Sequence, residues 1–263
     1  MHPGPGDQPT DKDQQPATNN QQPATSNQQP APAFVERIVA LIEVLLCSDY
    51  PTQLAIGATF TAFGYGPYSA PGHLRLWYVV GLSLADAVAL IALVLLFLAA
   101  HGERPRAVLI GGQSVLQEAA VGVPMVLVAL GIGLTVILVI QRVAPSLHTV
   151  PENPFQALLR TRSDAWLLAL VVVVAGGVRE EIQRAFLLHR FEVWLGGGGF
   201  GIAATSVAFG AGHFLQGVDA AIATGLLGAF WGLVYLRRRS IVAPVISHAG
   251  FDLAQIAGFL VAG

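Results

Sequence analysis

The sequence has little charge and almost no lysine. Only 11% of its 263 residues are charged, and Lys12 is the single lysine; soluble domains usually carry about 25% charged residues. Cys47 is the only cysteine, so an intramolecular disulfide cannot form. With a net charge of −2, nothing in the composition suggests a nucleic-acid partner. A water-soluble chain that is 54% hydrophobic would expose large apolar patches, so the composition predicts a protein that lies in lipid.

The first 33 residues lack apolar runs. They are rich in Gln, Pro, Asn and Ala, and QQPA recurs at 14, 21 and 28. Such a segment cannot bury enough apolar surface to offset the entropy of ordering, so we expect 1–33 to be a disordered tail. It has no basic region followed by an apolar one, which does not fit a cleaved signal peptide. We expect 34–263 to form one transmembrane helical domain.

Long apolar runs follow one another from residue 34 to the C-terminus. Because a membrane core of roughly 30 Å needs about 20 apolar helical residues, each run is a candidate span. The first region stays open: 34–48 is amphipathic and either lies on the membrane or joins 52–68 as one span. The pattern predicts an all-α, polytopic transmembrane bundle of about seven helices, at 34–70, 76–100, 119–140, 165–194, 200–216, 219–236 and 240–262.

Arginine placement indicates an orientation. Arg237, Arg238 and Arg239 end one predicted span, which favours a cytoplasmic loop there. Counting spans back from this loop places the N-terminal tail on the same side if 34–70 crosses once. We therefore expect an integral membrane protein with a cytoplasmic N-terminus.

Several ionisable residues occur inside the predicted spans, where charge is costly and usually faces a bundle interior or a water cavity. Most belong to the last four helices; the set comprises Asp86, Arg179, Glu180, Glu181, Arg184, His189, His213, His248 and Asp252. Asp86 is interpreted as a buried hydrogen-bond partner and His189 as an interfacial residue. A separate cluster of small residues, Ala221, Gly225 and Gly228, predicts a close helix contact.

Three of these polar residues are expected at one depth. At 1.5 Å per helical residue, Glu180 lies roughly 22 Å, His213 roughly 21 Å and Asp252 roughly 20 Å from the membrane side of the arginine cluster. His248 comes out nearer, at roughly 14 Å. Similar depth on three different helices predicts a shared polar cavity.

Their spacing suits hydrolytic chemistry. Glu180 with Arg184, and His248 with Asp252, are i,i+4 pairs on one helix face. A carboxylate in a partly dry site can activate water, and donors can hold the developing oxyanion. Alternatively, two histidines and a glutamate could bind zinc and lower the pKa of its water. Both schemes stay open at this point.

The same residues resemble the signature of the CAAX protease and bacteriocin-processing family of intramembrane peptidases. That signature has paired glutamates followed by arginine, then FxxxH, then HxxxN or HxxxD. Here the three parts read Glu180-Glu181-Ile182-Gln183-Arg184, then Phe209-Gly210-Ala211-Gly212-His213, then His248-Ala249-Gly250-Phe251-Asp252. The resemblance covers about 170–255, inside a motif-bearing core at 165–262.

The resemblance implies roles for these residues. The glutamate pair would supply the water-activating carboxylate, and His213 would orient or bind that water. His248 and Asp252 would stabilise the oxyanion or complete the site. Arg184 would hold the second glutamate, and Phe209 would support the site. If a zinc ion takes part, His213, His248 and Glu180 are its candidate ligands; a site without a cofactor is the other alternative.

One spacing departs from the family pattern, because two residues instead of three separate the glutamate pair from Arg184. Alignment on the glutamates makes Glu180 the water-activating group and Glu181 the partner of Arg184. Alignment on Arg184 places Arg179 at the catalytic position and predicts a weak or inactive enzyme. We favour the first alignment, because a helix can rotate slightly.

The expected function is therefore an intramembrane endopeptidase in the cytoplasmic membrane of a bacterium. Its partners would be membrane lipid and a peptide or protein substrate, with a lipidated substrate implied only by the family. The alternative is a non-catalytic membrane protein of the same fold, such as a scaffold or a bacteriocin-immunity protein. A proton-coupled carrier is disfavoured because the two halves show no internal repeat.

Overall fold

The computed structural model describes residues 1–2, 34–70, 73–151 and 153–262. The tail predicted at 1–33 lies, apart from Met1 and His2, outside these residues. In chain order the elements are α1 (Phe34–Leu46), α2 (Tyr50–Ala62), β1 (Tyr68–Ala70), β2 (His73–Leu74), α3 (Leu76–Ala100), α4 (Pro105–Leu109), α5 (Val115–Val143), η1 (Pro145–Leu147), η2 (Gln156–Leu158), α6 (Arg162–Val171), η3 (Val172–Arg179), α7 (Glu180–Trp194), α8 (Gly198–Ala211), η4 (Phe214–Gln216), α9 (Val218–Arg238) and α10 (Val242–Ala262).

The predicted all-α class is confirmed, and each predicted span contains helix. Within the described ranges, α3, α5 and α9 are each long and apolar enough to cross a membrane. The bent pair α1 and α2 would add a fourth span if it crosses as one unit. The predicted helix at 165–194 corresponds to α6, η3 and α7, which follow one another without a break.

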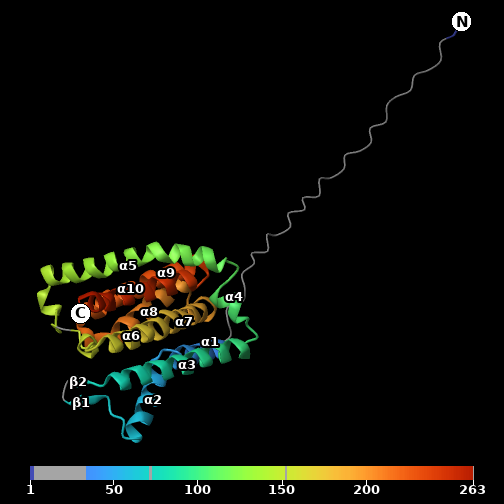
Figure 1. Cartoon of the computed structure of the whole chain (residues 1–263). Helices are drawn as coiled ribbons and strands as arrows, with labels where there is room; N and C mark the ends of the chain where they lie inside the picture. The colour runs from blue at the N-terminus through green and yellow to red at the C-terminus, as the bar shows by residue number, and fades with distance from the viewer. Residues whose placement is uncertain (3–33, 71–72, 152, 263) are drawn as a thin grey trace. The chain divides into compact units, whose positions relative to one another are not determined.

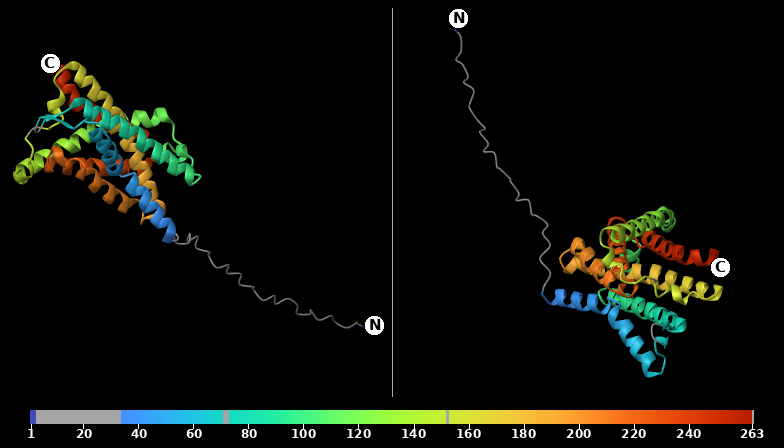
Figure 2. Two further views of the ribbon diagram at one scale, coloured as in Figure 1. Left: turned by 90° about the horizontal axis from the view of Figure 1, so that it is seen from below. Right: turned by 90° about the vertical axis from the view of Figure 1, so that its left-hand side faces the viewer.

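The chain bends by 43° at the corner between α1 and α2 (Figure 2). Leu41 and Leu45 on α1 are exposed, whereas Ala40 and Glu43 face the rest of the chain. Asp49, at the corner, has a φ of 81°, a conformation that is uncommon for a residue with a side chain. The amphipathic pattern predicted at 34–48 is therefore present, and its apolar face is free to contact lipid.

The helices pack side by side, with α7 to α10 between α5 and α3 (Figure 1). Small residues allow the closest approaches, as is common where helices meet within a membrane. A Cβ on Gly250 of α10 would lie 2.5 Å from Val126 of α5. One on Gly210 of α8 would lie 2.6 Å from the carbonyl oxygen of Ala221 and 3.2 Å from Gly225 of α9. The predicted close contact through Ala221 and Gly225 is confirmed.

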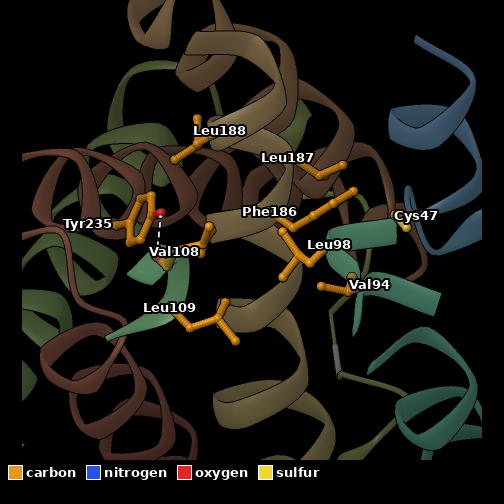
Figure 3. Close-up of a cluster of buried hydrophobic side chains, with 10 residues drawn as sticks. Cys47, Val94, Leu98, Val108, Leu109, Phe186, Leu187, Leu188 and Tyr235 are labelled. Carbon is orange, nitrogen blue, oxygen red and sulfur yellow. Dashed lines mark hydrogen bonds between the residues drawn. The ribbon is translucent and has the colours of Figure 1, made fainter. Parts of the chain in front are cut away.

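A buried apolar cluster surrounds α7 (Figure 3). Phe186 and Leu188 of this helix are fully buried, and the buried Cys47 belongs to the same cluster. The Tyr235 hydroxyl of α9 donates a 2.9 Å hydrogen bond to the carbonyl of Val108 in α4, which satisfies the phenol at the edge of the cluster. This packing fixes the helix that carries the glutamate pair.

Two local features differ from the prediction. The segment read as part of a span at 34–70 ends in a short antiparallel hairpin, in which Tyr68 pairs with Leu74. The span read at 200–216 ends as α-helix at Ala211, so His213 lies just beyond the helix end. Gly64 and Gly66 precede the hairpin, and Gly212 precedes His213, where glycine favours a turn over helix.

Candidate active site

The glutamate pair begins where a π-helical segment becomes α-helix. Single π-helical turns within α-helices are rare and are frequent at functional sites. Two glycines of this segment let α10 approach closely: a Cβ at Gly176 would lie 2.7 Å from Asp252 Oδ2, and one at Gly177 would lie 2.7 Å from Ala249 Cβ. Local sequence thus brings the start of α7, with Glu180, against the polar face of α10.

Glu181 is held between two partners and is only 1% exposed. Its Oε1 accepts a hydrogen bond from Arg184 Nη1, and His248 Nδ1 lies 2.8 Å from the same oxygen. Because an ionised carboxylate only accepts, Nδ1 of His248 carries the donated proton. The Arg184 partner is therefore Glu181, as expected when the family motif is aligned on the glutamates.

Glu180 occupies a different environment from its neighbour. Its Oε2 lies 3.7 Å from His248 Nε2, and its Oε1 lies 3.8 Å from Arg179 Nη2. Asp252 Oδ2 also lies 3.7 Å from His248 Nε2. His248 therefore contacts three carboxylates, with Nδ1 fixed on Glu181 and Nε2 facing the other two.

His213 follows the end of α8, and one of its ring nitrogens already has a hydrogen-bond partner. Its Nδ1 is 2.8 Å from the carbonyl oxygen of Phe209, which can only accept a hydrogen bond. Nδ1 is therefore the donor, and in the tautomer protonated at Nδ1 alone Nε2 is an acceptor. The Phe209 ring lies edge-on to His213, with centroids 4.9 Å apart, which restricts the imidazole further.

Aromatic side chains from α8 and α9 contact His248 and Arg184. Trp231 stacks on the His248 ring with centroids 3.8 Å apart, and its indole N–H donates to Ser247 Oγ at 3.1 Å. The Arg184 guanidinium lies 4.7 Å above the Phe209 ring, a cation–π geometry. The sequence analysis did not identify Trp231. Its signal was weak, because a tryptophan in an apolar helix is ordinary.

A second polar cluster adjoins Glu180 and was identified only in part. Arg179 Nη1 lies 2.9 Å from Asp49 Oδ1, and Nη2 lies 3.6 Å from Asp86 Oδ2. The same Nη1 donates to Gln183 Oε1 at 3.3 Å. Asp86 is fully buried as predicted, but neither of its carboxylate oxygens has a hydrogen-bond partner among the described residues, so its contact is the ion pair with Arg179 and not the predicted hydrogen bond. The sequence analysis does not single out Asp49.

A cavity of about 550 Å³ joins these groups to the surroundings. It is lined by Glu180, Arg184, Phe209 and His213, whereas Glu181, His248 and Asp252 are not in its wall. A larger cavity, of about 740 Å³, lies beside the hairpin and contains none of the motif residues. Of these two cavities the smaller is the candidate active site, because titratable motif residues line it and do not line the other.

Comparison with protein family models gives a match that covers this part of the chain. Residues 162–254 match the family described as type II CAAX prenyl endopeptidase Rce1-like. The match confirms the family resemblance carried by the three motifs, all of which lie within it. A search of curated proteins and a search of solved structures each gave no match.

A zinc ion does not fit the arrangement of these residues. Across the described ranges, no three His, Cys, Asp or Glu side chains are grouped as metal ligands. Of the three candidate ligands, His248 already directs Nδ1 to Glu181, and its Nε2 is 3.7 Å from Glu180. Zinc ligands would need to converge at about 2 Å from one point. No step is therefore derived through a metal.

Proposed function

We propose that the chain is an intramembrane endopeptidase that hydrolyses a peptide bond near the membrane. This proposal rests on the different environments of Glu180 and Glu181. Glu180 reaches the cavity that His213 also lines, while Glu181 is held outside it by Arg184 and His248. The match to a family of endopeptidases supports the same reaction.

The proposed chemistry begins with a water molecule between Glu180 and His213. Glu180 accepts a proton from this water, and Nε2 of His213 accepts the second hydrogen bond and aligns the oxygen. The water oxygen forms a bond to the scissile carbonyl carbon, whose oxygen becomes the oxyanion. Glu180 then passes its proton to the amine as the C–N bond breaks.

His248 and Asp252 do not line the cavity, but Nε2 of His248 lies 3.7 Å from Glu180, which does, and these two residues are proposed to serve the oxyanion. Glu180, Glu181 and Asp252 surround the His248 ring and compensate the charge of an imidazolium. In that form Nε2–H is a donor that can stabilise developing negative charge. Trp231, stacked on the ring, would keep it in place.

The proposed setting is the cytoplasmic membrane of a bacterium, with the N-terminus in the cytoplasm. The substrate is a peptide or protein presented at the membrane. The family description names prenyl endopeptidases, so a lipidated substrate is included in the proposal.

The test is cleavage of a mixed peptide library by protein purified in detergent. Wild type is compared with Glu180→Gln and His213→Ala, with and without chelator. Glu192→Gln is the matched control, because Glu192 is paired with Arg239 and does not line the cavity. General-base loss is expected to lower the rate by about a hundredfold or more, while the control cleaves as wild type does.

Equal cleavage by wild type and Glu180→Gln would contradict the proposed role of Glu180. Loss of cleavage on adding chelator would instead show that a metal takes part. If every peptide that wild type cleaves is also cleaved by Glu180→Gln, or if wild type cleaves none, the non-catalytic scaffold or immunity function becomes the better explanation.

A further inference from the structure

Arg179, the residue directly before the glutamate pair, has three carboxylates around one guanidinium. Asp49 from the α1–α2 corner is the nearest, at 2.9 Å, followed by Asp86 from α3 at 3.6 Å. Glu180 is the most distant, at 3.8 Å. Arg179 is itself 4% exposed, so these charges interact with little screening by water.

The order of these distances matters for Glu180. A buried arginine without another partner would form a close ion pair with the nearest carboxylate. If neither Asp49 nor Asp86 engaged Arg179, Glu180 would be that carboxylate. An ion pair would withdraw Glu180 from His248, which now lies 3.7 Å from its other oxygen.

Two features hold the guanidinium on the side of Asp49. The side chain of Gln183, one helical turn further on, accepts from Arg179 Nη1 and donates to the carbonyl of Cys47 at 2.8 Å. Asp49 also accepts a 2.6 Å hydrogen bond from Gln53. Asp49 also has a positive φ, a strained conformation that most residues avoid. Such strain often occurs at functional sites.

We infer that Asp49 and Asp86 are positioning residues that engage Arg179 and so leave Glu180 free to act on water. This inference rests on the proposed role of Glu180. It also accounts for an arginine at the position that alignment on Arg184 would make catalytic. Arg179 is compatible with an active site because its charge is directed to the α1–α2 corner and to α3.

The variants follow from the geometry. Asp49→Asn removes the nearest competing charge, and asparagine tolerates a positive φ better than most residues do. Asp86 at 3.6 Å and Glu180 at 3.8 Å are then the remaining partners, so the guanidinium is expected to move toward both and to pair with Glu180 more closely than in wild type. Adding Arg179→Gln removes the competing cation, so the double variant Asp49→Asn/Arg179→Gln should free Glu180 again. Asp86→Asn serves as a second single variant if Asp49→Asn does not fold.

The first readout is peptide cleavage. We expect Asp49→Asn to lower kcat by about tenfold to a hundredfold with little change in KM, since the general base is impaired and substrate contacts are not. The double variant should recover kcat toward wild type. Glu192→Gln, which breaks an ion pair outside the cavity, should leave kcat unchanged. Melting temperatures of all variants would show that the proteins are folded.

The second readout does not need activity. Dicyclohexylcarbodiimide reacts with a carboxyl group that has taken up a proton, which an ion pair with arginine disfavours, so labelling at mildly acidic pH reports whether Arg179 is paired with Glu180, and mass spectrometry locates the adduct. We expect labelling of Glu180 in wild type, reduced labelling in Asp49→Asn, and restored labelling in the double variant. This pattern would support the inference even if no peptide were cleaved, in which case only the proposed function would fail.

Equal kcat in wild type and Asp49→Asn would overturn the inference while leaving the peptidase proposal intact. A double variant no more active than Asp49→Asn would do the same, because a purely structural ion pair predicts no rescue. Equal labelling of Glu180 in all three proteins, including none, would overturn it independently.

Discussion

At the residue scale, the ion pair of Glu181 and Arg184 is shielded from solvent, with side chains 1% and 6% exposed. Glu181→Gln would leave the Arg184 charge buried without its partner. Removing one member of a buried pair typically costs about 3–5 kcal/mol. We expect a loss of this size in the free energy of unfolding, measured by chemical denaturation in detergent.

The control for this prediction is Glu192→Gln. Arg239 is 55% exposed where it pairs with Glu192, so solvent screens the interaction. Loss of an exposed pair is expected to cost less than about 1 kcal/mol. Equal losses in the two variants would show that the burial of Glu181 contributes nothing.

Glu103, in the connection between α3 and α4, makes stability sensitive to acid. Burial by itself raises its pKa, but the hydrogen bonds from His189 at 2.8 Å and Arg190 at 2.7 Å outweigh burial, so the pKa of Glu103 lies below its ordinary 4.5. A lowered pKa gives stability that is complete above 4.5 and is lost as pH falls through the folded value.

We therefore expect the melting temperature in detergent to fall on acidification below about pH 4.5, in part through Glu103. Glu103→Gln should have a lower melting temperature near neutral pH and a shallower fall in acid. Parallel curves for wild type and the variant would contradict the role assigned to Glu103.

At the scale of elements, the contact of η3 with α10 depends on glycine. Gly176→Ala would place a methyl group 2.7 Å from Asp252 Oδ2, closer than atoms approach without movement. Either Asp252 or the helix must shift, and a displacement near 1 Å in an active site can cost about a hundredfold in rate. We expect Gly176→Ala to cleave peptides at least tenfold more slowly.

Gly131→Ala in α5 is the matched control, because a Cβ there would meet nothing within 4 Å. Its cleavage rate and melting temperature should equal those of wild type. If Gly176→Ala were as active as Gly131→Ala, close packing of η3 on α10 would not be needed for the site.

The helices and the motif residues could be predicted because their signals are local. Apolar runs define the spans, and carboxylates or histidines within them are rare enough to be noticed. The pairing of Arg179 with Asp49 could not be predicted, since it joins segments 130 residues apart through side-chain direction. The π-helical segment likewise has no composition that distinguishes VVVAGGVR from ordinary helix. Trp231 became part of the site only through packing against His248.

At the scale of the whole described domain, ion pairs tie several helices together at the arginine-rich ends. Arg238 of α9 donates to Glu118 of α5, and Arg190 of α7 donates to Glu43 of α1. Another polar contact joins the α5–α6 connection to α9, where His148 Nδ1 lies 2.7 Å from Asp219 Oδ2. Charged groups at the ends of helices agree with an orientation across a membrane.

This arrangement permits a direct test of the proposed orientation. Arg237 at the end of α9 and Ser146 after α5 are both exposed, and arginine counting places them on opposite sides of the membrane. Each is replaced by cysteine in a Cys47→Ser background, which removes the buried native thiol. A membrane-impermeant maleimide should label Ser146→Cys in intact cells and Arg237→Cys only after the membrane is permeabilised. The reverse pattern would place the arginine cluster outside the cell. Labelling of both positions in intact cells would mean that α9 and α5 do not separate them, and the bundle would then need a different path through the membrane.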